Sequence, residues 1–189
     1  MSAIALQERP GAARGESDRL EVALGSRETP IGVLHLAATA QGVVRIGFGS
    51  QEALDDMAVE LGFGPGSDGA GDPAWLEEPA RQLDQYFTGT RRRFDLALDR
   101  RFSHGFYRRV LDTLIGVAYG TTVSYGELAR LAGAPRAARA VGTAMSTNPI
   151  PLIVPCHRVV RSDGSVGEYG GRPEVKSWLL EHERSHLGS

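Results

Sequence analysis

The sequence predicts an α+β protein in two parts, the second of which contains a helix-turn-helix. Three short apolar runs before residue 50 are typical of strands, and apolar residues recur at helical spacing in the second half. The charge also divides: residues 1–100 hold 10 arginines against 16 acidic residues, whereas residues 101–161 hold 8 arginines against 2. We place the two parts at residues 18–100 and 106–186, and expect residues 1–17 to be flexible.

The composition excludes several classes of protein. The chain has 189 residues, 41% of them hydrophobic, which is enough for a sizeable core. No apolar run is long enough to cross a bilayer, and the N-terminus lacks the charged-then-apolar order of a secretory signal. The single cysteine, Cys156, excludes a disulfide framework and a zinc site built from several cysteines. We therefore expect a cytoplasmic protein that uses no metal and no cofactor.

The first part is expected to be a small sheet with two helices. Strands are predicted at residues 20–24, 31–37, 43–48 and 94–98. One helix is predicted at residues 51–61. A second helix starts at Asp72, which suits an N-cap before Pro73, and ends at Gly89. His35 alternates with apolar neighbours, so we interpret it as structural.

The second part follows a linker at residues 99–105. A helix is predicted at residues 106–117. Ser124 is the expected N-cap of a helix at residues 125–131, and a tight turn then leads to a helix at residues 136–145. Two short helices around such a turn form a helix-turn-helix, although many helical hairpins share this pattern without binding DNA.

Two arginines favour a DNA-binding version of this motif. Arg136 and Arg139 lie at the start of the second helix, the end of a recognition helix that enters a groove. The excess of positive charge in residues 101–161 also favours a polyanionic partner.

The only thiol lies in an unusual segment. An apolar run at residues 150–154 reads as a strand-like approach to Pro155 and Cys156, and His157 and Arg158 follow directly. A lone cysteine is often a small apolar core residue. Proline, histidine and arginine around it are poor core filler, so we interpret Cys156 as a nucleophile. Pro155 and the strand-like approach argue against a helix N-terminus at the thiol.

The chain ends in a glycine-rich loop and a helix. The loop, GEYGG at residues 167–171, has Tyr169 as its one large side chain. A terminal helix is predicted at residues 174–186, with Trp178, Leu179 and Leu180 facing inward together with two charged residues, Lys176 and Glu183.

These motifs resemble those of the O6-alkylguanine-DNA alkyltransferases, a family of DNA repair proteins. PCHRV at residues 155–159, preceded by NPIPLIV and followed by GxVGxYGG, carries the resemblance. VSYG at residues 123–126, AARAVG at residues 137–142, and Lys176, Leu179-Leu180 and Glu183 extend it. The match is dense from residue 106 to 183 and loose in the first hundred residues, chiefly TPIG at residues 29–32.

The resemblance implies a ribonuclease H-like lobe followed by a winged helix-turn-helix lobe. It implies that the protein flips O6-alkylguanine out of double-stranded DNA and transfers the alkyl group to Cys156. The product is a thioether, so each molecule reacts once. The implied protein is a monomer with no membrane partner, and repair of O4-alkylthymine and clustering on DNA are left open.

The chemistry suits these residue types. Attack on a saturated carbon needs a soft nucleophile such as thiolate, and a thiol near its free pKa needs a base. His157 is adjacent, but neighbouring side chains usually point apart. The resemblance implies a bridging water, with Glu183 orienting the imidazole, and a proton donated to guanine N3 by the Tyr125 hydroxyl. An ordinary solvated Glu183 and a purely packing Tyr125 are the alternatives.

The resemblance assigns further roles. Arg139 would fill the place of the flipped base, with a phosphate contact as the alternative. Asn148 would join the second helix to the thiol segment, with a plain helix cap as the alternative. Pocket walls are expected at Pro151, Val159, Tyr169 and Gly170, DNA contacts at Ser124, Tyr125, Arg136 and Arg139, and internal bonds at Arg158.

Two other functions compete with this interpretation. A non-catalytic, alkyltransferase-like damage-recognition protein is one, although such proteins replace the cysteine, usually with tryptophan. A cysteine hydrolase using Cys156 and His157 is the other. It has no evident oxyanion arrangement in the sequence, and it leaves the basic helix-turn-helix unexplained.

Overall fold

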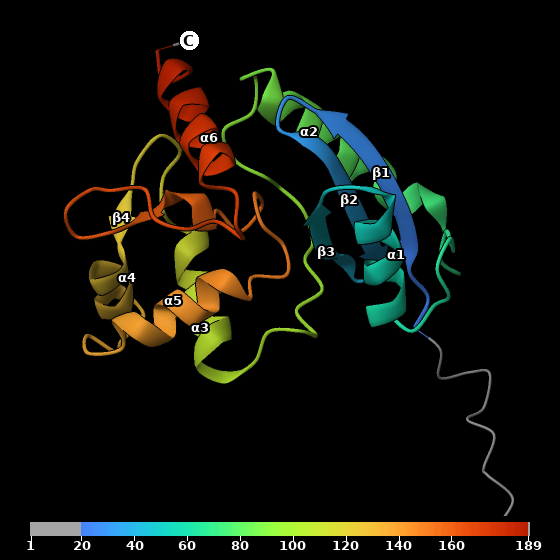
Figure 1. The fold of residues 1–189 in the computed structure, drawn as a ribbon, viewed down its shortest axis with the longest axis horizontal. Coiled ribbons are helices and arrows are strands. Elements are labelled where there is room, and N and C mark those ends of the chain that lie inside the picture. Colours follow the sequence, from blue (N-terminus) through green and yellow to red (C-terminus); the bar gives the residue numbers. More distant parts are fainter. Residues whose placement is uncertain (1–19, 189) are drawn as a thin grey trace, which may run out of the picture.

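The computed structural model describes residues 20–188, so the expectation for residues 1–17 lies outside the described residues. The chain forms two lobes joined side by side (Figure 1). The first lobe holds a three-stranded antiparallel sheet of β1 (Ala23–Thr29), β2 (Gly32–Thr39) and β3 (Gly42–Phe48), in that order. The helices α1 (Gln51–Glu60) and α2 (Glu77–Phe87) cover opposite faces of this sheet.

Successive side chains in the strands point to opposite faces of the sheet, so each face packs against a different helix. Ala37 and Val44 face Met57 of α1 in a small apolar cluster. Leu34 and Ile46 face the other way and join the main core with α2. His35 is buried and bonds to Ser26 Oγ and to the backbone carbonyls of Gly49 and Ser50, which is a structural role.

Two strand predictions in this lobe are wrong. The first strand begins at Ala23 rather than at residue 20 and runs to Thr29, because it pairs with β2 along its whole length. Its outer half, SRET, lacks the apolar signal that marks a strand.

Residues 94–98 form no strand, only a single bridge between Leu98 and Val43. Gln82 of α2 explains this, since its side chain bonds to both the N–H and the carbonyl of Asp95 over 2.8 and 2.9 Å. These backbone groups are therefore occupied by a helix side chain instead of a neighbouring strand.

The helix start at Asp72 is confirmed, since its carboxylate accepts from the Ala74 N–H over 2.9 Å. The first turn is a 3₁₀ helix, η2 (Pro73–Leu76), and α2 follows it at Glu77.

The second lobe is mainly helical. It contains α3 (Gly105–Ile115), β4 (Val123–Ser124), α4 (Tyr125–Leu131), α5 (Ala138–Ser146), η3 (Cys156–Arg158), β5 (Val159–Val160) and α6 (Pro173–Ser185). The Ser124 cap is confirmed, because its hydroxyl accepts from the Glu127 N–H over 3.1 Å. The second helix of the helix-turn-helix starts at Ala138, later than expected, because the N–H of Ala137 bonds to the Ala134 carbonyl in a turn.

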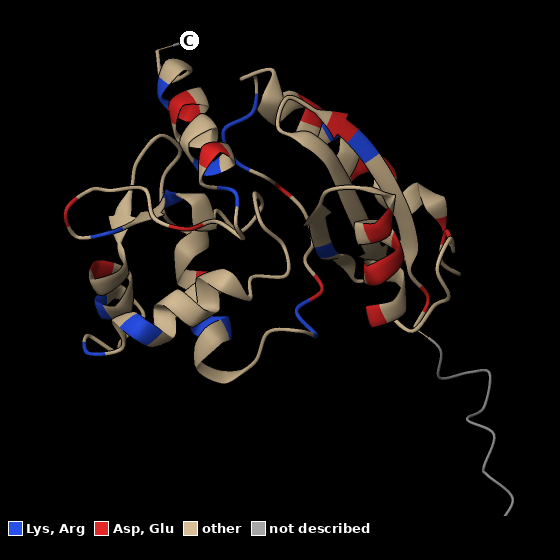
Figure 2. Ribbon diagram, viewed as in Figure 1, with Lys and Arg blue, Asp and Glu red and all other residues tan. Residues whose placement is uncertain are grey.

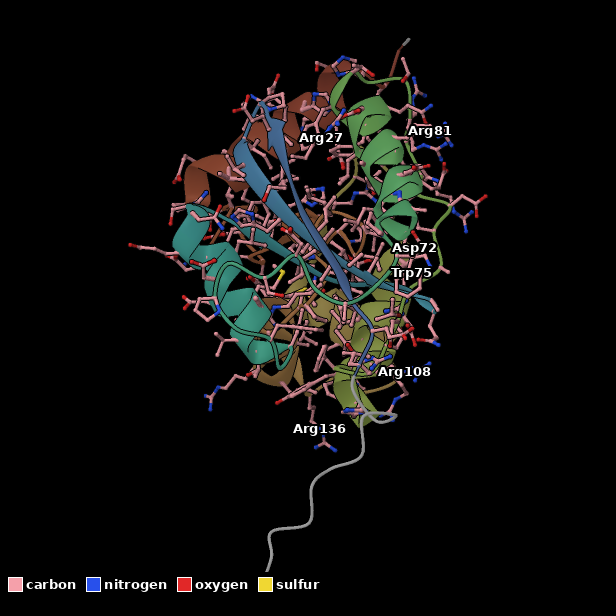
Figure 3. The ribbon with its side chains drawn as sticks, turned by 90° about the vertical axis from the view of Figure 1, so that its right-hand side faces the viewer. Arg27, Asp72, Trp75, Arg81, Arg108 and Arg136 are labelled. Atoms are coloured by element: carbon pink, nitrogen blue, oxygen red, sulfur yellow. The ribbon has the colours of Figure 1, made fainter. Side chains whose placement is uncertain are left out.

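Charge is divided in space as well as in sequence. Figure 2 shows acidic residues along α1 and basic residues around α4 and α5. Arg136 lies in the turn before α5, and its side chain extends away from the molecule (Figure 3). None of the helices in residues 20–188 is long and apolar enough to cross a membrane.

The two lobes share one core. Leu34 and Leu83 of the first lobe and Leu114 and Leu179 of the second belong to the same buried cluster. A backbone hydrogen bond of 2.8 Å joins the Ile46 N–H of β3 to the carbonyl of Pro149. The segment that leads to the thiol is therefore attached directly to the sheet of the first lobe.

Candidate active site

The approach to the thiol is a tight turn, and the expected strand-like run is wrong. The Val154 N–H bonds to the Ile150 carbonyl over 2.9 Å. Leu152, at the turn, has a φ of 72° and is the one non-glycine residue with positive φ in residues 20–188. Such a conformation is strained for a side chain with a Cβ, and it persists because the surrounding core determines it. The apolar run therefore packs the turn instead of pairing in a sheet.

Asn148 ties this turn to the thiol. Its side-chain N–H₂ donates to the Val154 carbonyl over 2.9 Å and to Cys156 Sγ over 3.2 Å. Its side-chain oxygen accepts from the Ile150 N–H over 3.1 Å. Because Asn148 follows the end of α5, its contacts join that helix to the thiol, which is more than a helix cap does.

The environment of Cys156 opposes ionisation on balance. The residue is 6% exposed, and burial raises the pKa of its thiol. The hydrogen bond from Asn148, a contact with Tyr169 and the charge of Lys176 act in the opposite direction. Cys156 is also the first residue of η3, contrary to the expectation, but a helix of three residues supplies little dipole.

The geometry identifies the free nitrogen of His157. His157 Nε2 and Glu183 Oε1 are 2.8 Å apart, and both side chains are fully buried. Burial alone would raise the pKa of Glu183, but the hydrogen bonds and charges of His157 and Arg158 hold it at about 2. The carboxylate is thus ionised and only accepts, so Nε2 carries the proton.

The other ring nitrogen is therefore available as a base. Burial lowers the pKa of His157, although Glu183 opposes this, so the imidazole rests in its neutral form. Nδ1 then holds a lone pair, and it is buried without a hydrogen-bond partner. An unpartnered buried acceptor on the residue that follows the thiol is a candidate base for it, through a bridging water.

Glu183 also accepts hydrogen bonds from three residues other than His157. The donors are the Tyr86 hydroxyl at 2.9 Å, the Gly120 N–H at 2.8 Å, and Arg158, whose Nη2 and Nε approach to 2.9 and 3.0 Å. Arg158 also donates to the Val117 carbonyl over 2.6 Å, which confirms that it forms internal bonds.

The sequence alone does not identify Tyr86 as a residue of the site, and it indicates Lys176 without giving it a role. Tyr86 lies within the helix expected between Asp72 and Gly89, but nothing in the local sequence marks its partner. Lys176 is buried, and its ammonium donates to the Val159 carbonyl over 2.6 Å. Burial lowers the pKa of Lys176, with the Cys156 charge acting against this shift.

A cavity of about 290 Å³ opens above the thiol. Four of the expected residues line it together with Cys156 and Asn148: Tyr125, Pro151, Tyr169 and Gly170. Val159 does not line this cavity; its side chain is fully buried elsewhere. Ile46 and Phe48 of the first lobe also line the cavity, and the rings of Phe48 and Tyr169 meet edge to face at 5.9 Å.

A comparison with models of known protein families identifies the family of this chain. The model of the 6-O-methylguanine DNA methyltransferase DNA-binding domain matches residues 105–185, and that of the ribonuclease-like domain matches residues 23–100. The chain belongs to the 6-O-methylguanine DNA methyltransferase family. The predicted resemblance is thereby confirmed, as is the α+β fold with a ribonuclease-like lobe before a DNA-binding lobe.

Individual methyltransferases support this assignment. A methylated-DNA–protein-cysteine methyltransferase of Mus musculus is 40% identical over 167 residues, which cover 82% of this chain and 78% of that protein. One of Mycolicibacterium paratuberculosis is 40% identical over 166 residues, covering 84% and 90%.

Solved structures of the family have the same fold. The crystal structure of the Mycobacterium tuberculosis O6-methylguanine methyltransferase has a TM-score of 0.73 at 36% identity, covering 88% of this chain and 94% of that one. The M. tuberculosis OGT solved in complex with DNA has a TM-score of 0.72 at 36% identity, covering 86% and 93%.

Of the four predicted DNA contacts of this methyltransferase fold, Ser124, Arg136 and Arg139 do not line the cavity above the thiol. Arg136 and Arg139 are exposed, the former before α5 and the latter in its first turn. Ser124 is half-buried, and its hydroxyl is engaged in capping α4. Tyr125, the first residue of α4, belongs to both regions, since it also lines the cavity.

We predict that Asn148→Ala raises the pKa of the Cys156 thiol, because the variant loses the donor that stabilises thiolate. It should also cost about 1–3 kcal/mol of stability, since the Ile150 N–H loses its partner and the Val154 carbonyl keeps only the Cys156 N–H. The titration is followed by ultraviolet absorbance of the thiolate, and stability by denaturant unfolding. Ser146→Ala is the matched control, because Ser146 lines the same cavity but bonds only to Thr143. A lower or unchanged thiol pKa in Asn148→Ala would contradict the assignment.

Proposed function

We propose that this protein repairs DNA by transferring an alkyl group from O6 of guanine to Sγ of its own Cys156. The observation that carries the proposal is the only thiol of the chain, at a cavity lined by Tyr125 and Tyr169 and followed directly by the buried pair of His157 and Glu183. The protein is a methylated-DNA–protein-cysteine methyltransferase, the activity for which its relatives are named.

The reaction exchanges a proton for an alkyl group. Nδ1 of His157 takes the proton of the thiol through a bridging water, and Glu183 stabilises the imidazolium that forms. Sulfur then attacks the alkyl carbon, so an S–C bond forms as the C–O6 bond breaks and its electron pair stays on the guanine. Tyr125 supplies a proton to the leaving base; burial raises the pKa of this phenol, which keeps it protonated. The proton held by His157 then passes through water to the Tyr125 phenolate, so that overall the thiol hydrogen replaces the alkyl group on guanine.

The base must leave the duplex to reach this cavity, which costs a few kcal/mol of stacking and pairing. Arg139 is exposed on α5 and compensates by occupying the vacated place in the duplex. The basic surface around α4 and α5 meets the phosphates, while the acidic surface of α1 lies on the other lobe (Figure 2). The protein binds double-stranded DNA as a monomer, in the cytoplasm, where its thiol stays reduced.

One prediction from this function concerns stoichiometry. A thioether is not hydrolysed, so one protein molecule should remove one alkyl group from DNA carrying O6-methylguanine. Mass spectrometry should find one added methyl group on the peptide that contains Cys156. Cys156→Ala should transfer nothing and still bind DNA. Sustained turnover by the pure protein would refute the proposal. Methyl groups that remain on the DNA would also refute it.

Another prediction from this function concerns base flipping. Arg139→Ala should slow transfer from duplex DNA about tenfold or more, a loss of roughly 1.4 kcal/mol or more in the transition state. The reaction with free O6-benzylguanine should not change, because a free base needs no flipping. Arg184→Ala is the matched control, since Arg184 is an exposed arginine on α6. Equal losses on both substrates would show that Arg139 serves the pocket or the fold.

A further inference from the structure

Tyr86 connects the first lobe to the group that activates the thiol. It lies on α2 and is fully buried. Its hydroxyl donates to Glu183 Oε1 over 2.9 Å, and its backbone carbonyl accepts from His182 Nε2 over 2.8 Å. The helix α6 is therefore bonded to α2 at two successive residues, one of which is the partner of His157.

Three residues donate to one oxygen of Glu183. Oε1 accepts from the Tyr86 hydroxyl, from His157 Nε2 at 2.8 Å and from Arg158 Nη2 at 2.9 Å. Each such bond stabilises the carboxylate charge, so each lowers the attraction that remains for the other donors. Without the Tyr86 hydroxyl, more of that charge acts on His157. The second oxygen keeps its bonds to the Gly120 N–H and to Arg158 Nε, which hold the carboxylate in place.

We infer that Tyr86 is a positioning residue of the first lobe, which limits the proton affinity of His157 through Glu183 and so sets the fraction of Cys156 present as thiolate. The inference rests on the proposed function, in which His157 is the base for Cys156. It gives the ribonuclease-like lobe a defined influence on a reaction that takes place in the other lobe.

The Tyr86 hydroxyl can act only as a donor in this position. Burial raises the pKa of Tyr86 well above its ordinary value, and the charge of Glu183 adds to the effect, so the phenol remains protonated. A substitution at Tyr86 retains the other charged and titratable groups around Tyr86, Glu183, His157 and Cys156; they are Tyr119, Tyr125, Arg158, Tyr169, Lys176 and His182.

Tyr119 provides a matched control. Its hydroxyl is buried and has no hydrogen-bond partner, and its ring meets that of Tyr86 edge to face at 6.0 Å. Tyr119→Phe therefore removes a buried hydroxyl from the same aromatic cluster without changing a bond to Glu183.

The experiment measures the reaction of Cys156 with iodoacetamide against pH, on the full chain without DNA. Since Cys156 is the only cysteine, the rate reports one thiol. Tyr86→Phe should react roughly two- to fivefold faster near neutral pH, because the freed charge raises the proton affinity of His157 and favours the thiolate–imidazolium pair. Its midpoint should move to lower pH, whereas Tyr119→Phe should match the unmodified protein. An unchanged profile for Tyr86→Phe, or a shift to higher pH, overturns the inference.

A second substitution should change the rate of the Cys156 reaction in the opposite direction. A single 3-fluorotyrosine at position 86 keeps the hydroxyl and makes it a stronger donor, so Cys156 should react more slowly than in the unmodified protein. A faster or equal reaction overturns the inference, even if Tyr86→Phe folds poorly. Transfer from alkylated DNA is assayed separately. An unmodified protein that accepts no alkyl group would refute the proposed function without altering the iodoacetamide comparison.

Discussion

The buried carboxylate of Glu183 is the constraint on which the rest of this structure depends. It is fully buried, and it remains ionised only because four residues donate hydrogen bonds to it. Two of these donors belong to the thiol segment, one to the chain before β4 and one to the first lobe. A buried charge without such partners would cost several kcal/mol, so any rearrangement of these elements is opposed. One buried group thus holds the base in position and adds to the shared core that packs the two lobes together.

The ionisation of Glu183 also links the fold to pH. Its pKa in the folded protein, about 2, lies below its ordinary value of 4.5. The ionised carboxylate therefore stabilises the folded state at neutral pH, and this contribution is lost as the pH falls toward 2. The same charge opposes the burial that disfavours imidazolium at His157. Stability and thiol activation consequently depend on the same hydrogen bonds.

Local signals in the sequence predicted local structure well. Ser124 caps α4 as expected because the cap and its partner lie three residues apart. The strand expected at residues 94–98 fails because Gln82, more than ten residues away, occupies the backbone of Asp95. Residues 150–154 look like a strand because they are apolar, yet Leu152 turns the chain.

The site itself was predicted largely through the family resemblance. That resemblance named Cys156, His157 and Glu183, and the structure brings the last two into contact across 26 residues of sequence. Tyr86 was not found, because its hydroxyl meets Glu183 across 97 residues and the sequence carries no local sign of that contact. Val159 was placed in the wall of the pocket but is buried outside the cavity.

The most direct test of this account is the rate of alkyl transfer against pH for Glu183→Gln, at saturating alkylated DNA. A neutral glutamine cannot stabilise imidazolium, so transfer should slow about tenfold or more and should rise only at higher pH, where the thiol ionises unaided. DNA affinity should change little, because Glu183 is buried away from the exposed arginines of the helix-turn-helix. A folded Glu183→Gln protein with an unchanged rate profile would contradict the account, because His157 would then act without its carboxylate or not act as a base.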